Sequence, residues 1–177
     1  MNNIVIVEDR LKRGISLAEQ FEELAEQHPE WGIQILAVCY FNENKEAAME
    51  DIKACVGHPF TIRHVSLWDF DETMDEYTNP GNEHTIVIID FFLDGDGSSG
   101  IPVRRVNIRY AKRADENRRK QLWFYTGTGF DNNRILCELV GKEHVLQMES
   151  VGDGILRLNL EDENFRMALL ANSAVGA

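Results

Sequence analysis

The feature that most restricts the fold of this sequence is a pair of short apolar runs that each lead into acidic residues. Residues 3–7 read NIVIV and precede Glu8 and Asp9, and residues 85–89 read TIVII and precede Asp90. A strand that is apolar on both faces is typical of a parallel sheet covered by helices on both sides. The two runs therefore predict adjacent core strands of an α/β domain.

Runs rich in β-branched and aromatic residues alternate with segments of helical periodicity along most of the chain. We expect strands at residues 3–7, 33–40, 60–68, 85–89, 122–125 and 144–148. Helices are expected at about 11–27, 45–55, 71–77, 103–120, 131–140 and 161–170. This alternation predicts an α/β fold with a doubly wound parallel sheet of about five strands, to which an added edge strand and helix are joined.

The length of 177 residues suits one domain, and 44% hydrophobic residues can form its core. We expect a single domain over residues 1–171, with an insertion at about 41–84 between the second strand and the strand that carries Asp90. Residues 172–177 have little to pack against and are expected to be a frayed tail.

Charge and hydropathy restrict the partners. Eighteen basic and thirty acidic residues give a net charge of −12, which makes nucleic acid and anionic membranes unfavourable partners. No apolar run reaches the roughly 20 residues of a membrane helix, and no signal peptide is recognised, so we expect a soluble, cytoplasmic protein. Eight basic residues lie within 104–120. We favour the interpretation that this stretch is a solvated face over the alternative that it is a docking surface for an acidic partner or RNA.

Polar side chains follow three of the expected strands directly. These are Glu8 with Asp9, Asp90, and Thr126. The carboxyl ends of parallel strands meet at one edge of the sheet, so these side chains are expected to converge there. Three carboxylates in one cleft repel each other unless a cation lies between them, and hard oxygen ligands suit Mg²⁺ or Mn²⁺.

The segments IVIVEDR, TIVIIDFFL and LWFYTGTG resemble, in this order, three landmarks of the response-regulator receiver family. The resemblance implies a flavodoxin-like (receiver-like) fold and two-component signal transduction, in which Asp90 accepts a phosphoryl group from a histidine kinase. It also implies that Glu8, Asp9, Asp90 and the backbone carbonyl of Phe92 bind Mg²⁺. Thr126 would be the switch hydroxyl that moves toward the phosphoryl group.

The chain departs from the family where a lysine normally ends the last strand. That region reads HVLQMES, which places Gln147 or Met148 at the position of the lysine, and Lys142 lies at the other end of the strand. The loop after Asp90 also lacks the usual proline. A neutral side chain contacts a phosphoryl group less strongly than an ammonium does, so slow and incomplete phosphorylation is expected.

Three interpretations remain open at this point. The first is an atypical receiver that accepts a phosphoryl group from a histidine kinase or another phosphodonor and signals through an output protein, without being an enzyme beyond removal of its own phosphoryl group. The second is a pseudo-receiver that binds partners without phosphorylation. The third is a Mg²⁺-dependent phosphohydrolase of the haloacid-dehalogenase type, which would need an acid where Phe92 stands. The sequence leaves a homodimer open.

Overall fold

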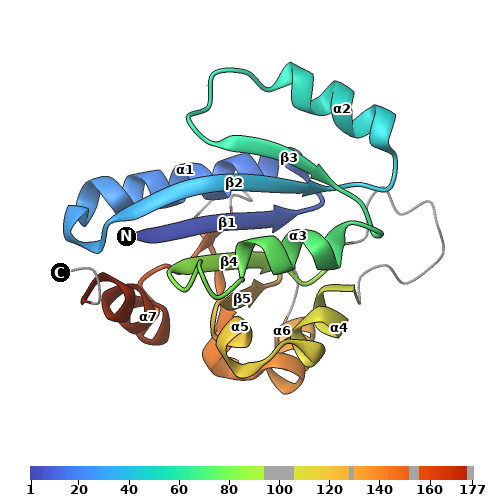
Figure 1. Cartoon of the computed structure of the whole chain (residues 1–177). Helices are drawn as coiled ribbons and strands as arrows, with labels where there is room; N and C mark the ends of the chain where they lie inside the picture. Colours follow the sequence, from blue (N-terminus) through green and yellow to red (C-terminus); the bar gives the residue numbers. More distant parts are fainter. Residues whose placement is uncertain (94–105, 128–129, 152–155, 175–177) are drawn as a thin grey trace.

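The computed structural model, which describes residues 1–93, 106–127, 130–151 and 156–174, is built around one parallel sheet. Its strand order is β3-β2-β1-β4-β5-β6, and every neighbouring pair is parallel (Figure 1). The strands are β1 (Asn2–Glu8), β2 (Ile33–Phe41), β3 (Thr61–Val65), β4 (Thr85–Asp90), β5 (Leu122–Tyr125) and β6 (Val145–Leu146). The predicted doubly wound α/β fold is confirmed, and the sheet is consistent with a flavodoxin-like arrangement.

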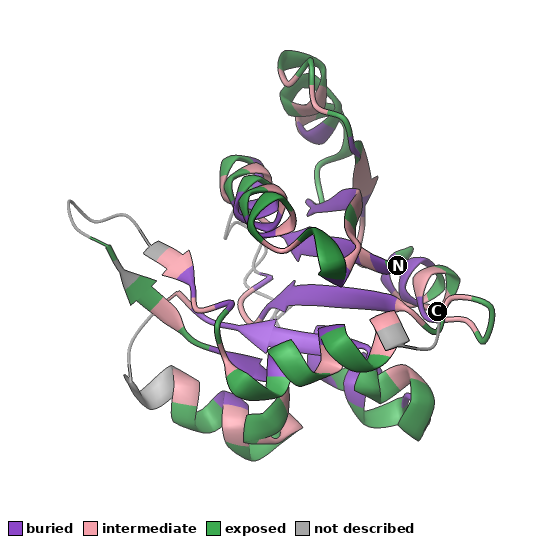
Figure 2. Cartoon of the chain, turned by 90° about the vertical axis from the view of Figure 1, so that its left-hand side faces the viewer, coloured by how far each residue is buried: buried purple, intermediate pink, exposed green. Residues whose placement is uncertain are grey.

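Helices cover both faces of the sheet. They are α1 (Leu11–Gln27), α2 (Lys45–Ala54), α3 (Phe70–Tyr77), α4 (Val106–Arg113), α5 (Glu116–Lys120), α6 (Phe130–Val140) and α7 (Glu163–Ala174), with short 3-10 turns η1 (Pro29–Trp31) and η3 (Lys142–His144). Buried side chains of α1, α2 and α7 pack on one face of the sheet, and those of α3, α4 and α6 pack on the other. Figure 2 shows the buried central strands between helices with exposed outer sides.

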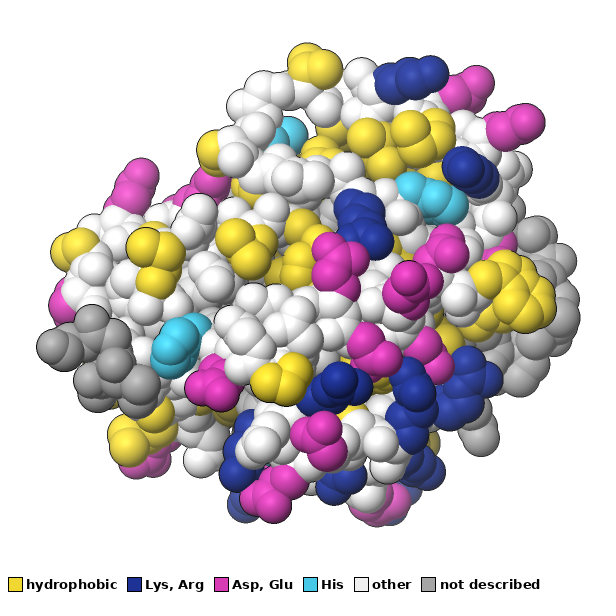
Figure 3. Space-filling view, in the orientation of Figure 1, with side chains coloured by type: hydrophobic (Ala, Val, Ile, Leu, Met, Phe, Trp, Pro, Cys, Tyr) yellow, Lys and Arg dark blue, Asp and Glu magenta, His cyan; other side chains and the backbone are white. Residues whose placement is uncertain are grey.

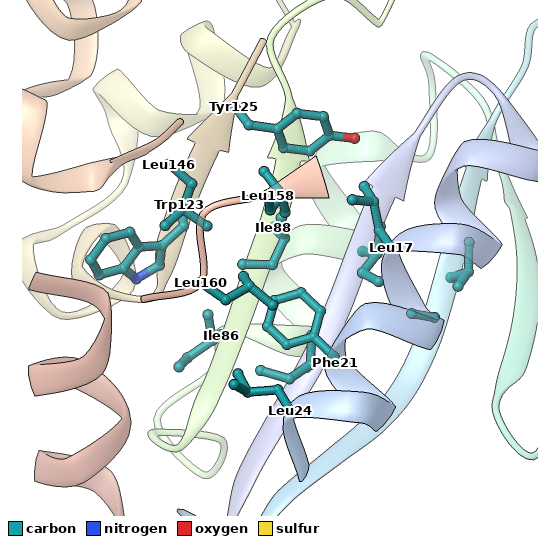
Figure 4. Close-up of a cluster of buried hydrophobic side chains, with 14 of the residues drawn as sticks. Leu17, Phe21, Leu24, Ile86, Ile88, Trp123, Tyr125, Leu146, Leu158 and Leu160 are labelled. Atoms are coloured by element: carbon teal, nitrogen blue, oxygen red, sulfur yellow. The ribbon is translucent and has the colours of Figure 1, made fainter. Parts of the chain in front are cut away.

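The two runs that first indicated the fold form the two central strands. All six residues of β4 are buried, and β1 is buried at every position except Asn3. Alternate side chains serve the two faces: Ile6 and Ile88 pack against α1, whereas Val7 and Ile89 face α3 and α4. Figure 4 shows the first of these clusters, in which residues from α1, β4 and β5 interdigitate. Burial on both faces explains why these strands have no polar alternation.

The expected edge strand is β3. It pairs with β2 alone, and Val38 and Tyr40 of β2 stand opposite Ile62 and His64 of β3. Its short length and its partly exposed side chains are typical of an edge position. The segment between β2 and β4 thus consists of α2, β3 and α3, which extend the sheet by one strand and cover it.

The basic stretch differs from the prediction of one continuous, weakly anchored helix. Asp115 caps a second helix by accepting a hydrogen bond from the Arg118 backbone, so the stretch divides into α4 and α5. Burial of Val106, Ile108 and Tyr110 anchors α4 firmly, and Val106 and Tyr110, about one turn apart, lie on the same face. Residues 103–105 and the loop 94–100, including its two aspartates, lie outside the described residues.

Two basic side chains of α4 and α5 are paired with acids of the neighbouring α3. Arg113 lies 3.3 Å from Asp71, and Arg118 lies 2.8 Å from Asp75. Figure 3 accordingly shows blue and magenta side chains intermixed over α3, α4 and α5. The stretch has no uniform positive face in this view, which agrees with a solvated surface that offsets local acidity.

The C-terminal part also differs from expectation. The last strand of the sheet, expected over 144–148, contains only Val145 and Leu146, because Met148–Ser150 (β7) pairs antiparallel with Leu156–Leu158 (β8). Residues 172–174, which were expected to belong to a frayed tail, form the last part of α7 instead, and residues 175–177 lie outside the described residues. The Ser173 hydroxyl donates to the Trp31 carbonyl at 3.0 Å and holds this end of the helix in place.

Among the helices of the described ranges, none combines the length and the hydropathy needed to span a membrane.

Gly14 is required where α1 crosses the carboxyl end of the sheet. A Cβ atom at this position would lie 2.8 Å from Cγ1 of buried Val38 and 3.4 Å from Cβ of Glu8. We expect Gly14→Ala to lower the free energy of unfolding by about 1–3 kcal/mol, because overpacking outweighs the gain in helix propensity. Denaturant unfolding measures this, with Ser16→Ala on the exposed side of α1 as control. A Gly14→Ala variant as stable as wild type would show that α1 can shift without loss.

Candidate metal centre

The strand order creates a switch point between β1 and β4. Successive strands extend from β1 to β3 on one side of this point and from β4 to β6 on the other. In open α/β sheets ligands bind at such a point, outside the carboxyl ends of the strands. Glu8 ends β1 and Asp90 ends β4, and the preceding residues Val7 and Ile89 are paired in register. The fold therefore brings the two predicted acids together at the switch point.

Register also places two tyrosines in the same row across the sheet. Tyr40 of β2 pairs with Glu8, and Tyr125 of β5 pairs with Asp90. Figure 4 shows Tyr125 at the end of the apolar cluster, with its hydroxyl directed across β4 toward β1. The row is thus tyrosine, glutamate, aspartate, tyrosine, and its members lie on the face covered by α1.

The three predicted acids form one cluster. Carboxylate oxygens of Glu8, Asp9 and Asp90 all lie within 4.8 Å of one another. Glu8 and Asp90 are 0% and 2% exposed, whereas Asp9 is half-buried and reaches toward solvent. An all-oxygen donor set with one accessible side fits Mg²⁺, which takes one or two protein carboxylates and keeps several waters. The side chains present therefore fit the predicted metal.

Glu8 is held by hydrogen bonds to both of its oxygens. The Tyr125 hydroxyl donates to Oε2, and the Arg10 backbone N–H donates to Oε1 at 3.1 Å. Burial raises the pKa of Glu8 well above its usual range, and the neighbouring Asp90 charge raises it further. Burial likewise raises the pKa of Tyr125 well above its usual range, so the phenol keeps its proton and remains a donor.

Asp90 has a different set of partners. The Phe92 N–H donates to Oδ1 at 3.1 Å, and Nη1 of Arg13 lies 3.8 Å from Oδ2. Burial raises the pKa of Asp90 to about 7, although the Phe92 N–H and the Arg13 charge act to lower it. Two buried carboxylates this close share a proton unless a cation compensates them.

Asn107 links the end of β4 to α4. It is 0% exposed, and its amide donates to the Asp90 carbonyl at 2.7 Å and to the Phe91 carbonyl at 3.2 Å. These bonds satisfy the carbonyls of the last residue of β4 and of the residue that follows it. The site backbone and α4 are therefore joined by hydrogen bonds. The only sequence signal was an amide within a helix segment whose neighbours are apolar.

The other predicted site residues are placed less completely. Thr126 directly follows β5, next to the strand that carries Asp90, and is 7% exposed. Phe92 contacts Asp90 through its N–H, and metal binding by its carbonyl stays a prediction. At the position of the missing lysine, exposed Gln147 accepts a hydrogen bond from Asn133 at 2.5 Å, while Met148 packs partly against the core.

Dinucleotide binding, which often occurs in sheets of this strand order, lacks its sequence signature here. That signature is a G-x-G-x-x-G turn between the first strand and the first helix, where backbone amides approach the pyrophosphate. Residues 8–15 read EDRLKRGI and contain Gly14 as their single glycine. Carboxylates stand where phosphate oxygens would have to lie, so a cation is the better match.

A separate cavity of about 650 Å³ lies at the opposite end of the sheet. Its lining includes Thr85 at the start of β4, Trp123 of β5 and Ala168 of α7. It contains no member of the carboxylate cluster. The predicted carboxylate site and this cavity therefore lie at opposite ends of the sheet.

Comparison of the chain with protein-family models, with curated proteins and with solved structures gave no match.

The buried carboxylates predict a pH-dependent stability in chelator. Asp90 has a pKa of about 7 in the folded state against about 3.9 when unfolded, so the folded state binds more protons between these values. Stability should therefore fall as the pH rises from about 4 to about 7. Asp90→Asn should remove much of this dependence and raise the free energy of unfolding at pH 8 by about 2–4 kcal/mol.

Thermal and denaturant unfolding in EDTA at pH 5 and pH 8 provide the measurement, with Glu19→Gln on exposed α1 as the control variant. Addition of Mg²⁺ at pH 8 should restore stability to wild type and much less to Asp90→Asn. A wild type that is more stable at pH 8 than at pH 5 in chelator would contradict the proposed charge repulsion.

Proposed function

We propose that this chain is an atypical response-regulator receiver that accepts a phosphoryl group on Asp90 with Mg²⁺ and signals through a partner protein. The observation that carries the proposal is the three-carboxylate cluster of Glu8, Asp9 and Asp90 at the switch point of the sheet. The order of the three motifs along the chain supports the same family. A histidine kinase or a small acyl phosphate would be the donor.

The side chains of the cluster would have different roles, some in metal binding and one in phosphoryl acceptance. Asp9, at the accessible side of the cluster, is suited to meet an incoming ion, while Glu8 is held in place by Tyr125 and the Arg10 backbone. The Phe92 N–H fixes one oxygen of Asp90. The second oxygen, Oδ2, is then oriented for attack on phosphorus. Bound Mg²⁺ would neutralise the carboxylates and align the phosphoryl oxygens.

Transmission would begin at two neighbours of Asp90. Thr126 follows the adjacent strand and can donate a hydroxyl to a phosphoryl oxygen if it moves toward Asp90, as the resemblance implies. Asn107 connects the Asp90 and Phe91 carbonyls to α4. A shift of the backbone after β4 would therefore displace α4 through these hydrogen bonds. The outer side of α4 is available to a partner.

The pseudo-receiver is the second candidate. It is favoured by Gln147, which is bonded to Asn133 of α6 and brings no charge to the site. In that case the cluster would bind a divalent cation without accepting a phosphoryl group. The phosphohydrolase interpretation is less favoured, because Phe92 occupies the position at which that class needs a second acid.

Intact-mass measurement after incubation with acetyl phosphate and Mg²⁺ tests the proposal. We expect wild type to gain one phosphoryl group, and Asp90→Asn or addition of EDTA to abolish this gain. Asp69→Asn, an exposed aspartate just before α3, is the matched control and should be labelled like wild type. Metal binding without any labelling would favour the pseudo-receiver, and turnover of p-nitrophenyl phosphate would favour the phosphohydrolase.

A further inference from the structure

The site lacks the lysine that ends the last strand in receiver domains, but it contains another cationic side chain. Arg13, in the first turn of α1, places Nη1 3.8 Å from Oδ2 of Asp90. Its side chain is 28% exposed, whereas that of Asp90 is 3% exposed. The guanidinium thus lies on the solvent side of the carboxylate, where an incoming phosphoryl group must arrive.

The length of this contact leaves the guanidinium available for another ligand. Charge-assisted hydrogen bonds between a guanidinium and a carboxylate are about 2.7–2.9 Å long, so a separation of 3.8 Å is an ion pair without a direct hydrogen bond. Oδ1 is already occupied by the Phe92 N–H. Oδ2, the oxygen beside Arg13, is therefore the better oriented nucleophile, and a group attached to it would lie next to the guanidinium.

We infer that Arg13 is the phosphoryl-binding cation of this chain, in place of the missing lysine; the inference rests on the proposed function. In the step concerned, Asp90 Oδ2 forms a bond to phosphorus as the bond from phosphorus to the acyl oxygen breaks. The acetate leaves with the electron pair, and no proton is transferred. The planar guanidinium fork can donate two parallel hydrogen bonds to the phosphoryl oxygens, which an ammonium cannot.

The position of Arg13 is built into the packing of α1. Leu11 and Leu17 are buried on either side of it along the helix, and the adjacent Gly14 lets the backbone approach Glu8 and Val38 closely. A bulkier residue at Gly14 would move α1, and with it the guanidinium, away from Asp90. The close approach therefore serves the site as well as the core.

Arg13 should act in opposite directions on the two ligands of the site. A guanidinium repels a divalent cation and attracts a phosphoryl group. We expect Arg13→Ala and Arg13→Gln to bind Mg²⁺ as tightly as wild type or more tightly, measured by calorimetry. With saturating Mg²⁺, the same variants should bind beryllofluoride about 10- to 100-fold more weakly, measured by ¹⁹F NMR. Arg13→Lys should retain much of this affinity, and Lys12→Ala, an exposed neighbour with the same charge change, should match wild type.

The outcomes separate the two levels of the proposal. Beryllofluoride affinity unchanged in Arg13→Ala and Arg13→Gln would overturn the role of Arg13 and leave the proposed function intact. Parallel loss of both Mg²⁺ and beryllofluoride binding would show that Arg13 only supports the structure of the site, which also overturns the inference. A wild type that binds Mg²⁺ but no beryllofluoride would overturn the proposed function together with the inference.

Discussion

The burial of Glu8 and Asp90 side by side is the constraint to which the rest of the site responds. Both carboxylates end strands that are apolar on both faces, and the parallel register leaves them no freedom to separate. A buried carboxylate without compensation is costly, and two neighbouring ones are more so. The groups around the two carboxylates supply hydrogen-bond donors or positive charge. Gly14 allows the close packing of α1 that places some of these groups near the site.

Those compensating groups come from different parts of the chain. Tyr125 of β5 reaches Glu8 of β1 across the intervening β4, and the Phe92 N–H returns to Asp90 from the following loop. The N-terminus of α1, which begins at Leu11, adds the partial positive charge of its unpaired amides. Arg13 is the one full positive charge that the described structure pairs with Asp90. Several of these groups act to lower the two pKa values, yet burial first, and the neighbouring acids second, keep the pKa values of Glu8 and Asp90 raised.

The sequence predicted the fold and the acids because both depend on local patterns. Continuous apolar runs mark strands buried on both faces, and a strand end is visible where such a run meets a charge. Tyr125 and Arg13 were missed because their roles depend on register and on helix placement. A tyrosine at the end of an apolar strand looks like core until its partner across two strands is known. Arg13 looks like a surface residue of an amphipathic helix until Gly14 brings that helix close.

The errors at the C-terminal end have a similar physical origin. Residues 144–148 read as one strand by composition, yet Met148 finds an antiparallel partner in Leu158 and leaves the sheet. The basic segment read as one helix because charge dominated its pattern, while Asp115 provided a cap that restarts the helix. Non-local strand pairing ended the last strand of the sheet early, and capping divided the basic helix. Neither feature can be recognised from composition.

The central claim is that Glu8, Asp9 and Asp90 together bind a divalent cation. Paramagnetic Mn²⁺ tests it directly, because it broadens the amide NMR signals of residues close to its binding site. At substoichiometric Mn²⁺ we expect the signals of Asp9, Phe91 and Phe92 to broaden first, and excess Mg²⁺ to reverse the effect. Broadening centred on the exposed acids of α1, with the signals around Asp90 unaffected, would contradict it.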